Sequence, residues 1–201
     1  EKSSKRTSFR SNATPRTIFA VPHVKEIGEG GLLGMALHPQ FASNHFIYFY
    51  YTYEGGETGT HNRVVRYRLQ DNKLDQEEIL IDAIPGAPNH NGGRIAFGPD
   101  GYLYVTTGDA QNPSQAQDTK SLAGKILRIT DIGIIPPSNP YGNQIYSYGH
   151  RNPQGLSWDA QGNLWSTEHG RSGLQSGLDE LNKIEKGKNY GWPTTQGDKK
   201  Q

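Results

Sequence analysis

A glutamate, a histidine and an arginine stand at corresponding places in three glycine-rich runs, where they could share one chemical task. The runs are residues 28–34, 88–94 and 148–155. His90 could act as a general base, because a histidine side chain titrates near ~6.5 and accepts a proton readily at neutral pH. Arg151 and Asn152 offer a cation and an amide, which suit an anionic or carbonyl-rich ligand. Together with Glu29, these side chains form the candidate site.

Each of these residues also has a structural interpretation that the sequence leaves open. His90 could be a structural histidine bonded to neighbouring backbone, and Arg151 could fix a loop through a salt bridge. Other kinds of site find less support. The chain has no cysteine, and its seven histidines lack the paired spacing of zinc ligands. A Rossmann dinucleotide site is excluded, because Gly34 falls one place too late and no strand–helix pattern surrounds it.

The three runs belong to a sequence repeat of about sixty residues. Its large apolar positions, Leu37, Phe97 and Trp158, are 60 and 61 residues apart. A second β-rich run follows each of them, at residues 46–53, 103–107 and 164–167. Further strands are indicated at residues 63–69 and 125–129, where apolar and polar residues alternate or β-branched residues gather.

This repeat predicts an all-β fold made of propeller blades, because a blade is a sheet of about four strands. Gly101 and Gly162 fit the tight turns between strands, which need a positive φ. Residues 112–122 could hold a turn of helix within a loop. The alternative is a β-sandwich whose three modules are similar by accident.

In a propeller, the loops that precede successive blades converge on the central axis. We therefore expect Glu29, His90 and Arg151 to face one central pocket. Propellers close with typically four to eight blades, and this chain supplies about three. We expect either a fragment of a longer chain or a ring completed by a second copy, and exposed sheet edges then favour self-association.

Composition narrows the function classes. The 201 residues include 25 glycines, 21 basic and 20 acidic residues, so no strong positive field favours a nucleic acid or an anionic membrane. No apolar run approaches the ~20 residues of a membrane span, and no signal peptide is evident. Residues 1–22 are predicted to be a basic segment, either disordered or a remnant of a preceding blade. Residues 23–201 are predicted to form the partial propeller.

Eight motifs together resemble the soluble PQQ-dependent glucose/sorbosone (aldose sugar) dehydrogenase family. They occur in the family's order and cover roughly residues 20–195. The motifs are residues 28–34, 90–101, 107–109, 121–128, 148–155, 167–170, 179–182 and 189–193. The resemblance implies a six-bladed propeller with the quinone PQQ over the axis, and the oxidation of aldoses to lactones.

The resemblance also implies roles for the candidate residues. His90 would take the proton from the anomeric hydroxyl of the sugar, while a hydride passes from that carbon to the quinone. Arg151 would lie against a quinone carbonyl and stabilise negative charge that develops there. Asn152 would hold PQQ beside it, and Glu29 and Asn89 would line the pocket.

Calcium is implied in the same way. The backbone carbonyls of Gly170 and Arg171 would hold one ion near PQQ, in keeping with the oxygen ligands that calcium prefers. The carboxylate of Glu180 and the carbonyl of Tyr190 would hold a second, structural ion. For Glu180 the alternative is a loop carboxylate that caps backbone amides.

Three function classes stay open at this stage. The first is a PQQ- and calcium-dependent aldose dehydrogenase with a sugar substrate and an external electron acceptor, and the resemblance places such an enzyme in the periplasm or outside the cell. The second is a non-catalytic propeller that binds carbohydrate or protein, or an inactive fragment of the enzyme. The third is a calcium-dependent lactonase on the same architecture.

Overall fold

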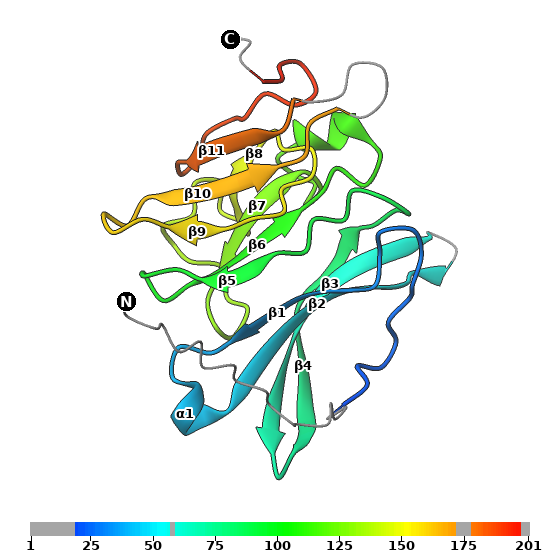
Figure 1. Cartoon of the computed structure of the whole chain (residues 1–201), viewed down its shortest axis with the longest axis vertical. Helices are drawn as coiled ribbons and strands as arrows, with labels where there is room; N and C mark the ends of the chain where they lie inside the picture. Colours follow the sequence, from blue (N-terminus) through cyan, green and yellow to red (C-terminus); the bar gives the residue numbers. More distant parts are fainter. Residues whose placement is uncertain (1–18, 57–58, 172–177, 198–201) are drawn as a thin grey trace, which may run out of the picture.

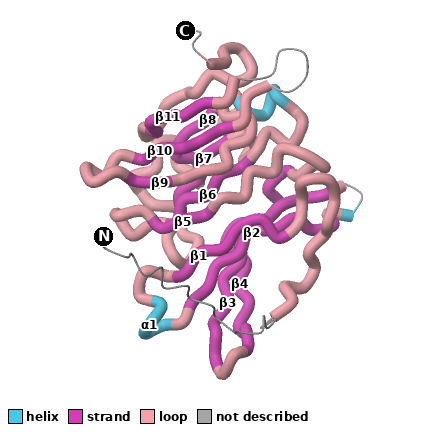
Figure 2. Tube along the Cα trace, in the orientation of Figure 1, coloured by secondary structure: helices cyan, strands magenta, loops and turns pink. Residues whose placement is uncertain are grey.

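Three antiparallel sheets follow one another along the chain and lie side by side (Figures 1 and 2). The computed structural model describes residues 19–56, 59–171 and 178–197. Within each sheet, every strand pairs with the next one in sequence. This up-and-down order is that of a propeller blade, as the repeat predicts.

The first sheet contains four strands and the second contains four, while the third contains three. The first consists of β1 (Leu32–Leu37), β2 (Phe46–Glu54), β3 (Thr60–Gln70) and β4 (Lys73–Pro85), with helix α1 (Phe41–Asn44) between β1 and β2. The second consists of β5 (Ile95–Phe97), β6 (Leu103–Thr107), β7 (Lys125–Ile129) and β8 (Ile145–Tyr148). The third consists of β9 (Ser157–Trp158), β10 (Leu164–Glu168) and β11 (Glu180–Ile184).

The sixty-residue spacing corresponds to equivalent places in the three sheets. Each of the three repeat positions ends an inner strand and pairs with the start of the second strand. The pairs are Leu37 with Ile47, Phe97 with Leu103 and Trp158 with Leu164. Gly101 and Gly162 have φ of 78° and 81°, as their predicted turns require.

Some elements are not evident in the sequence pattern. Helix α1 occupies the first hairpin in place of a tight turn. Strands β4, β8 and β11 were not among the predicted runs. A 3₁₀ turn, Pro113–Ala116, lies within the loop where a turn of helix was expected.

The apolar core is divided between the sheets. One buried cluster joins the first and second sheets, and includes Tyr50, Ile84 and Leu127. Another joins the second and third sheets through Tyr104 and Ile184. Because burial of apolar surface is the main favourable term in folding, these clusters fix how neighbouring sheets meet.

A third cluster lies on the far side of the first sheet, around Tyr51 and Tyr67, and Phe19 and Val21 pack against it. These two residues belong to the segment that was predicted as a disordered end or a remnant of another blade. Residues 1–18 of that segment lie outside the described residues. In the described part of the chain, no helix is long and apolar enough to span a membrane.

The loop between β6 and β7 is anchored by Lys125, which is fully buried. Its ammonium donates to the carbonyls of Gln115, Ala116 and Ala123 at 2.8, 3.0 and 2.6 Å. Burial lowers the pKa of Lys125 to about 8. This anchor matters for the site because Gln117 of the same loop bonds Asn189 and Trp192.

Candidate functional site

The candidate residues gather at one edge of the second and third sheets. His90 precedes β5, Asp109 follows β6, Arg151 follows β8 and His169 follows β10. In an antiparallel sheet, the start of one strand and the end of the next lie at the same edge. The alternating chain direction therefore brings these loops together.

His90 is held by a buried carboxylate. Its Nδ1 lies 2.8 Å from Oδ1 of Asp109, and Asp109 has no exposed surface. With Asp109 ionised, Nδ1 carries the proton, and Nε2 is the nitrogen left to accept one. Glu29 accepts a hydrogen bond from the backbone N–H of His90 at 3.0 Å. The imidazole is thus fixed in both orientation and tautomer.

Asp109 carries further bonds that tie the site together. Its Oδ2 accepts the indole N–H of Trp192 at 2.8 Å, and its own backbone N–H donates to the carbonyl of Arg151 at 2.8 Å. Sequence reasoning included Asp109 in a motif but gave it no role. The signal was present, because an aspartate directly after a strand, in the loop beside a candidate histidine, is a natural partner for that histidine.

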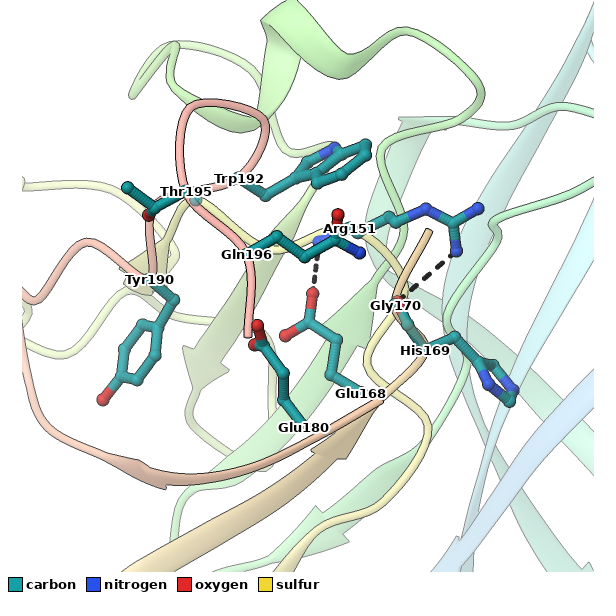
Figure 3. A pocket seen from close by; sticks show the side chains of 10 residues that line it. Arg151, Glu168, His169, Gly170, Glu180, Tyr190, Trp192, Thr195 and Gln196 are labelled. Atoms are coloured by element: carbon teal, nitrogen blue, oxygen red, sulfur yellow. Dashed lines mark hydrogen bonds between the residues drawn. The ribbon is translucent and has the colours of Figure 1, made fainter. Parts of the chain in front are cut away.

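Arg151 is fixed by a second buried network. Glu168, 6% exposed, accepts the backbone N–H of Arg151 on one oxygen (Figure 3). Its other oxygen lies 2.8 Å from Nδ1 of His150. Nε2 of His150 lies 2.9 Å from the hydroxyl of Ser147. The guanidinium of Arg151 donates to the carbonyl of His169 at 3.4 Å.

Two substitutions at Glu168, to alanine and to glutamine, test this network. Glu168→Ala removes the acceptor of a buried N–H, and we expect it to lower the free energy of unfolding by about 3 kcal/mol. Glu168→Gln can keep every bond if His150 changes tautomer and donates from Nε2 to Ser147, so a loss of about 1 kcal/mol is expected. Urea denaturation of both variants measures the difference. Equal losses would contradict the predicted change of tautomer.

Two pockets lie among these loops. The larger, of about 150 Å³, is lined by Glu29, Leu33, Asn91, Gly92, Asn152, Gln154 and His169. The smaller, of about 10 Å³, is lined by Gly149, Arg151, Glu168, His169, Gly170, Glu180, Tyr190, Trp192, Thr195 and Gln196 (Figure 3). A volume of this size holds about one water molecule or one ion.

The predicted site residues divide between the two pockets. Glu29 and Asn152 line the larger pocket, whereas Arg151 lines the smaller one. His90 and Asn89 line neither of the two. His90 and Arg151 are therefore linked through Asp109 and Trp192, and not by a common wall of either pocket.

Asn152 and Asn89 are both held in place by neighbouring loops. Asn152 is 2% exposed, and its Oδ1 accepts the backbone N–H of Gly92 at 2.9 Å and an amide proton of Gln154 at 3.0 Å. The backbone N–H of Asn89 donates to Gln111 at 3.3 Å.

Three of the four predicted calcium ligands also border the smaller pocket, namely Gly170, Glu180 and Tyr190. Glu180 already accepts the backbone N–H of Gly197 at 2.5 Å and the side-chain amide of Asn182 at 3.0 Å, which is the capping role named as its alternative. Within the described residues, no three His, Asp or Glu side chains are grouped to hold a metal ion. A cation here would therefore depend on backbone oxygens and on no more than the two carboxylates that line the pocket, those of Glu168 and Glu180.

That donor set fits the preference of calcium for oxygen ligands. Arg171, the fourth predicted ligand, has its guanidinium 5.9 Å from the ring of Trp192. Residues 172–177, which follow Arg171 in the sequence, lie outside the described part of the chain.

Comparison with known proteins connects this geometry to a family. The family model described as Glucose / Sorbosone dehydrogenase matches residues 1–200. The chain is 40% identical over 188 residues to the aldose sugar dehydrogenase YliI of Escherichia coli, covering 88% of this chain and 49% of that protein. It is 35% identical over 214 residues to quinoprotein glucose dehydrogenase B of Acinetobacter calcoaceticus, and the match covers 90% of this chain and 44% of that protein.

Solved structures agree with the sequence relatives. The PQQ-bound form of aldose sugar dehydrogenase from Streptomyces coelicolor superposes with a TM-score of 0.83 at 45% identity. That match covers 90% of this chain and 53% of the Streptomyces chain. The chain thus spans about half the length of the relatives it matches. It belongs to the glucose/sorbosone dehydrogenase family, and its three sheets are blades of a β-propeller of that family.

Proposed function

We propose that the protein is a quinoprotein oxidoreductase that oxidises aldose sugars at C1 to lactones. One observation carries this proposal. The buried carboxylate of Asp109 holds His90 by Nδ1 at 2.8 Å, beside a loop that presents Arg151 and Asn152. A base of fixed tautomer next to a cation and an amide suits the removal of a proton beside an electron-accepting, carbonyl-rich group.

The residues present fit PQQ in their chemistry. PQQ is a flat, carbonyl-rich anion, and Arg151, Asn152 and Gln154 bring a guanidinium and two amides to the pockets. When bound, PQQ supplies the quinone that accepts the hydride from C1 of the sugar. The protein supplies binding, orientation and charge.

His90 performs the proton step. Nε2 accepts the proton of the anomeric hydroxyl, so the sugar loses this proton and the hydride at C1 and becomes a lactone. Asp109 stabilises the imidazolium that forms, because a carboxylate 2.8 Å from Nδ1 favours the charged ring. Glu29, which accepts the backbone N–H of His90 at 3.0 Å, and Asn89, which precedes His90 in sequence, would lie beside the sugar.

Arg151 stabilises negative charge that develops on the carbonyl-rich ligand. We expect Arg151→Met to lower kcat by about 10²–10³, the usual loss for a removed electrostatic donor. Arg151→Lys keeps the charge but loses the planar fork, so a smaller loss is expected. Dye-linked turnover of the variants measures both. Arg63→Lys, which alters an arginine paired with Asp82 in the first sheet, is the control. Unchanged kcat in Arg151→Met would contradict the role.

Calcium is proposed at two places. The carbonyls of Gly170 and Arg171 would hold one ion near the cofactor, and Glu180 with the carbonyl of Tyr190 would hold another. The oxygen donors at the smaller pocket support one such ion, because a pocket of about 10 Å³ has room for about one. Isothermal titration with calcium, before and after Glu180→Gln, would test the second ion.

The electron acceptor and the cellular location of the protein are also proposals. An external electron acceptor would reoxidise the cofactor, and the location would be the periplasm or outside the cell. Leu32, Met35 and Leu37 on β1, at 52%, 61% and 46% exposed, form an apolar face that either a further blade or a second copy of the chain would cover.

A reconstitution experiment tests the proposed function. The purified chain is titrated with PQQ in the presence of calcium, and glucose and a dye acceptor are then added. Saturable binding with sugar-dependent dye reduction supports the enzyme. Binding of sugar without any quinone requirement would instead favour the non-catalytic binding propeller, and quinone-independent hydrolysis of lactones would favour the lactonase.

A further inference from the structure

Trp192 is a fixed aromatic residue between the two halves of the candidate site. It is 8% exposed. Its backbone N–H donates to the carbonyl of Gly149 at 2.9 Å, and its carbonyl accepts the side-chain amide of Gln117 at 2.5 Å. The loop between β6 and β7 and the loop that follows β8 therefore hold it from both sides.

The side chain of Trp192 contacts Asp109, which is the partner of His90, and it also contacts Arg151. Its indole N–H donates to Oδ2 of Asp109 at 2.8 Å, while Oδ1 of the same carboxylate faces His90. The guanidinium of Arg151 lies 5.5 Å from the centre of the ring, which is a cation–π distance (Figure 3).

We propose that Trp192 is a positioning residue shared by the base and the cation, holding Asp109 with its N–H and Arg151 with its ring. This inference rests on the proposed function, in which His90 and Arg151 act together. In this role Trp192 acts through these two neighbours.

The indole N–H has an electrostatic consequence for His90. A hydrogen bond to Oδ2 draws on the charge of Asp109 that would otherwise stabilise the imidazolium. Among the described residues, Asp109 bonds the ring of His90 and Glu29 bonds its backbone N–H. Without the indole N–H, more of the Asp109 charge acts on His90, and the imidazolium releases its proton less readily.

Trp192→Phe isolates this effect, because it keeps an aromatic ring and removes the N–H. We expect the titration midpoint of His90, followed by NMR without cofactor or sugar, to move up by about half a pH unit, or about threefold in proton affinity. The matched control is Trp165→Phe, which removes an indole N–H from Asp159 at 3.0 Å in the third sheet. We expect no shift of His90 in this control.

A double-mutant cycle tests whether the effect passes through the carboxylate. In an Asp109→Asn background, Trp192→Phe should leave the His90 midpoint unchanged, because the shared charge is absent. A midpoint that is the same in Trp192→Phe, Trp165→Phe and the wild type would overturn the proposal. So would a shift that persists undiminished in the Asp109→Asn background.

NMR spectra of the wild type provide a second test that does not require Trp192→Phe to fold. The indole N–H signal of Trp192 should move with the same midpoint as His90, because both groups bond one carboxylate. An indole N–H signal that does not change across the titration of His90 would contradict the coupling between Trp192 and His90. Neither NMR readout depends on the proposed activity, so absence of sugar oxidation in the wild type would count against the proposed function alone.

In the loaded enzyme, the acid limb of kcat/KM in Trp192→Phe should shift to higher pH by the same amount as the NMR midpoint. If the NMR midpoint of His90 shifts in Trp192→Phe but the acid limb of kcat/KM does not, the role of Trp192 is supported and the role of His90 as the base is contradicted.

Discussion

Replacement of His90 by asparagine is expected to lower sugar-dependent dye reduction by about 10²–10⁴, the usual contribution of a general base. Binding of PQQ should change much less, because Arg151 and Asn152 are untouched. Asparagine is chosen over alanine because His90 has φ of 62°, a left-handed conformation that asparagine tolerates. Steady-state kinetics at saturating sugar measures the loss.

His45→Asn is the matched control for this experiment. His45 has φ of 58° and is exposed beside helix α1, so the same substitution meets the same backbone requirement away from the site. We expect kcat to stay within a factor of two. Full activity in His90→Asn would show that another group removes the proton.

Asp109→Asn is expected to lower kcat almost as far, by about 10²–10⁴. The amide nitrogen would donate to Nδ1 of His90 and force the proton onto Nε2, the atom proposed to accept one. The bond from Trp192 can be kept, because the amide oxygen still accepts the indole N–H. The loss should appear mainly in kcat, with a smaller loss of stability of about 1 kcal/mol, because the amide nitrogen would face the backbone N–H of Gln111, which Oδ1 of Asp109 accepts at 2.9 Å.

Asp159→Asn serves as its control, since Asp159 also accepts an indole N–H, in the third sheet. A wild-type kcat in Asp109→Asn would mean that the carboxylate does not set the tautomer of His90. Combining His90→Asn with Asp109→Asn should give little more loss than either change alone, because the two residues act as one unit.

The architecture was predictable because the repeat lies in local sequence. Leu37, Phe97 and Trp158 keep their spacing since each ends an inner strand, and the glycines of the turns report a positive φ directly. Strand β4 was missed because it is rich in acidic and other residues that are uncommon in strands. Its pairing with β3, and not its own propensity, makes it a strand.

The candidate site was only partly predictable. Its positions follow from the repeat and the family motifs, since Glu29, His90 and Arg151 precede equivalent sheets. The link between them could not be predicted from the sequence, because Asp109 and Trp192 are 83 residues apart and meet only in the folded chain. The same reason applies to the pair of pockets, where the repeat predicted one central pocket.

The most direct measurement of the central claim is a single turnover without an acceptor. The chain is loaded with PQQ and calcium under anaerobic conditions, glucose is added, and the absorption of the bound cofactor is followed. The account predicts reduction of the cofactor in the wild type and a rate at least about 100-fold lower in His90→Asn. Saturable PQQ binding with no reduction by any aldose, or equal rates in both proteins, would contradict it.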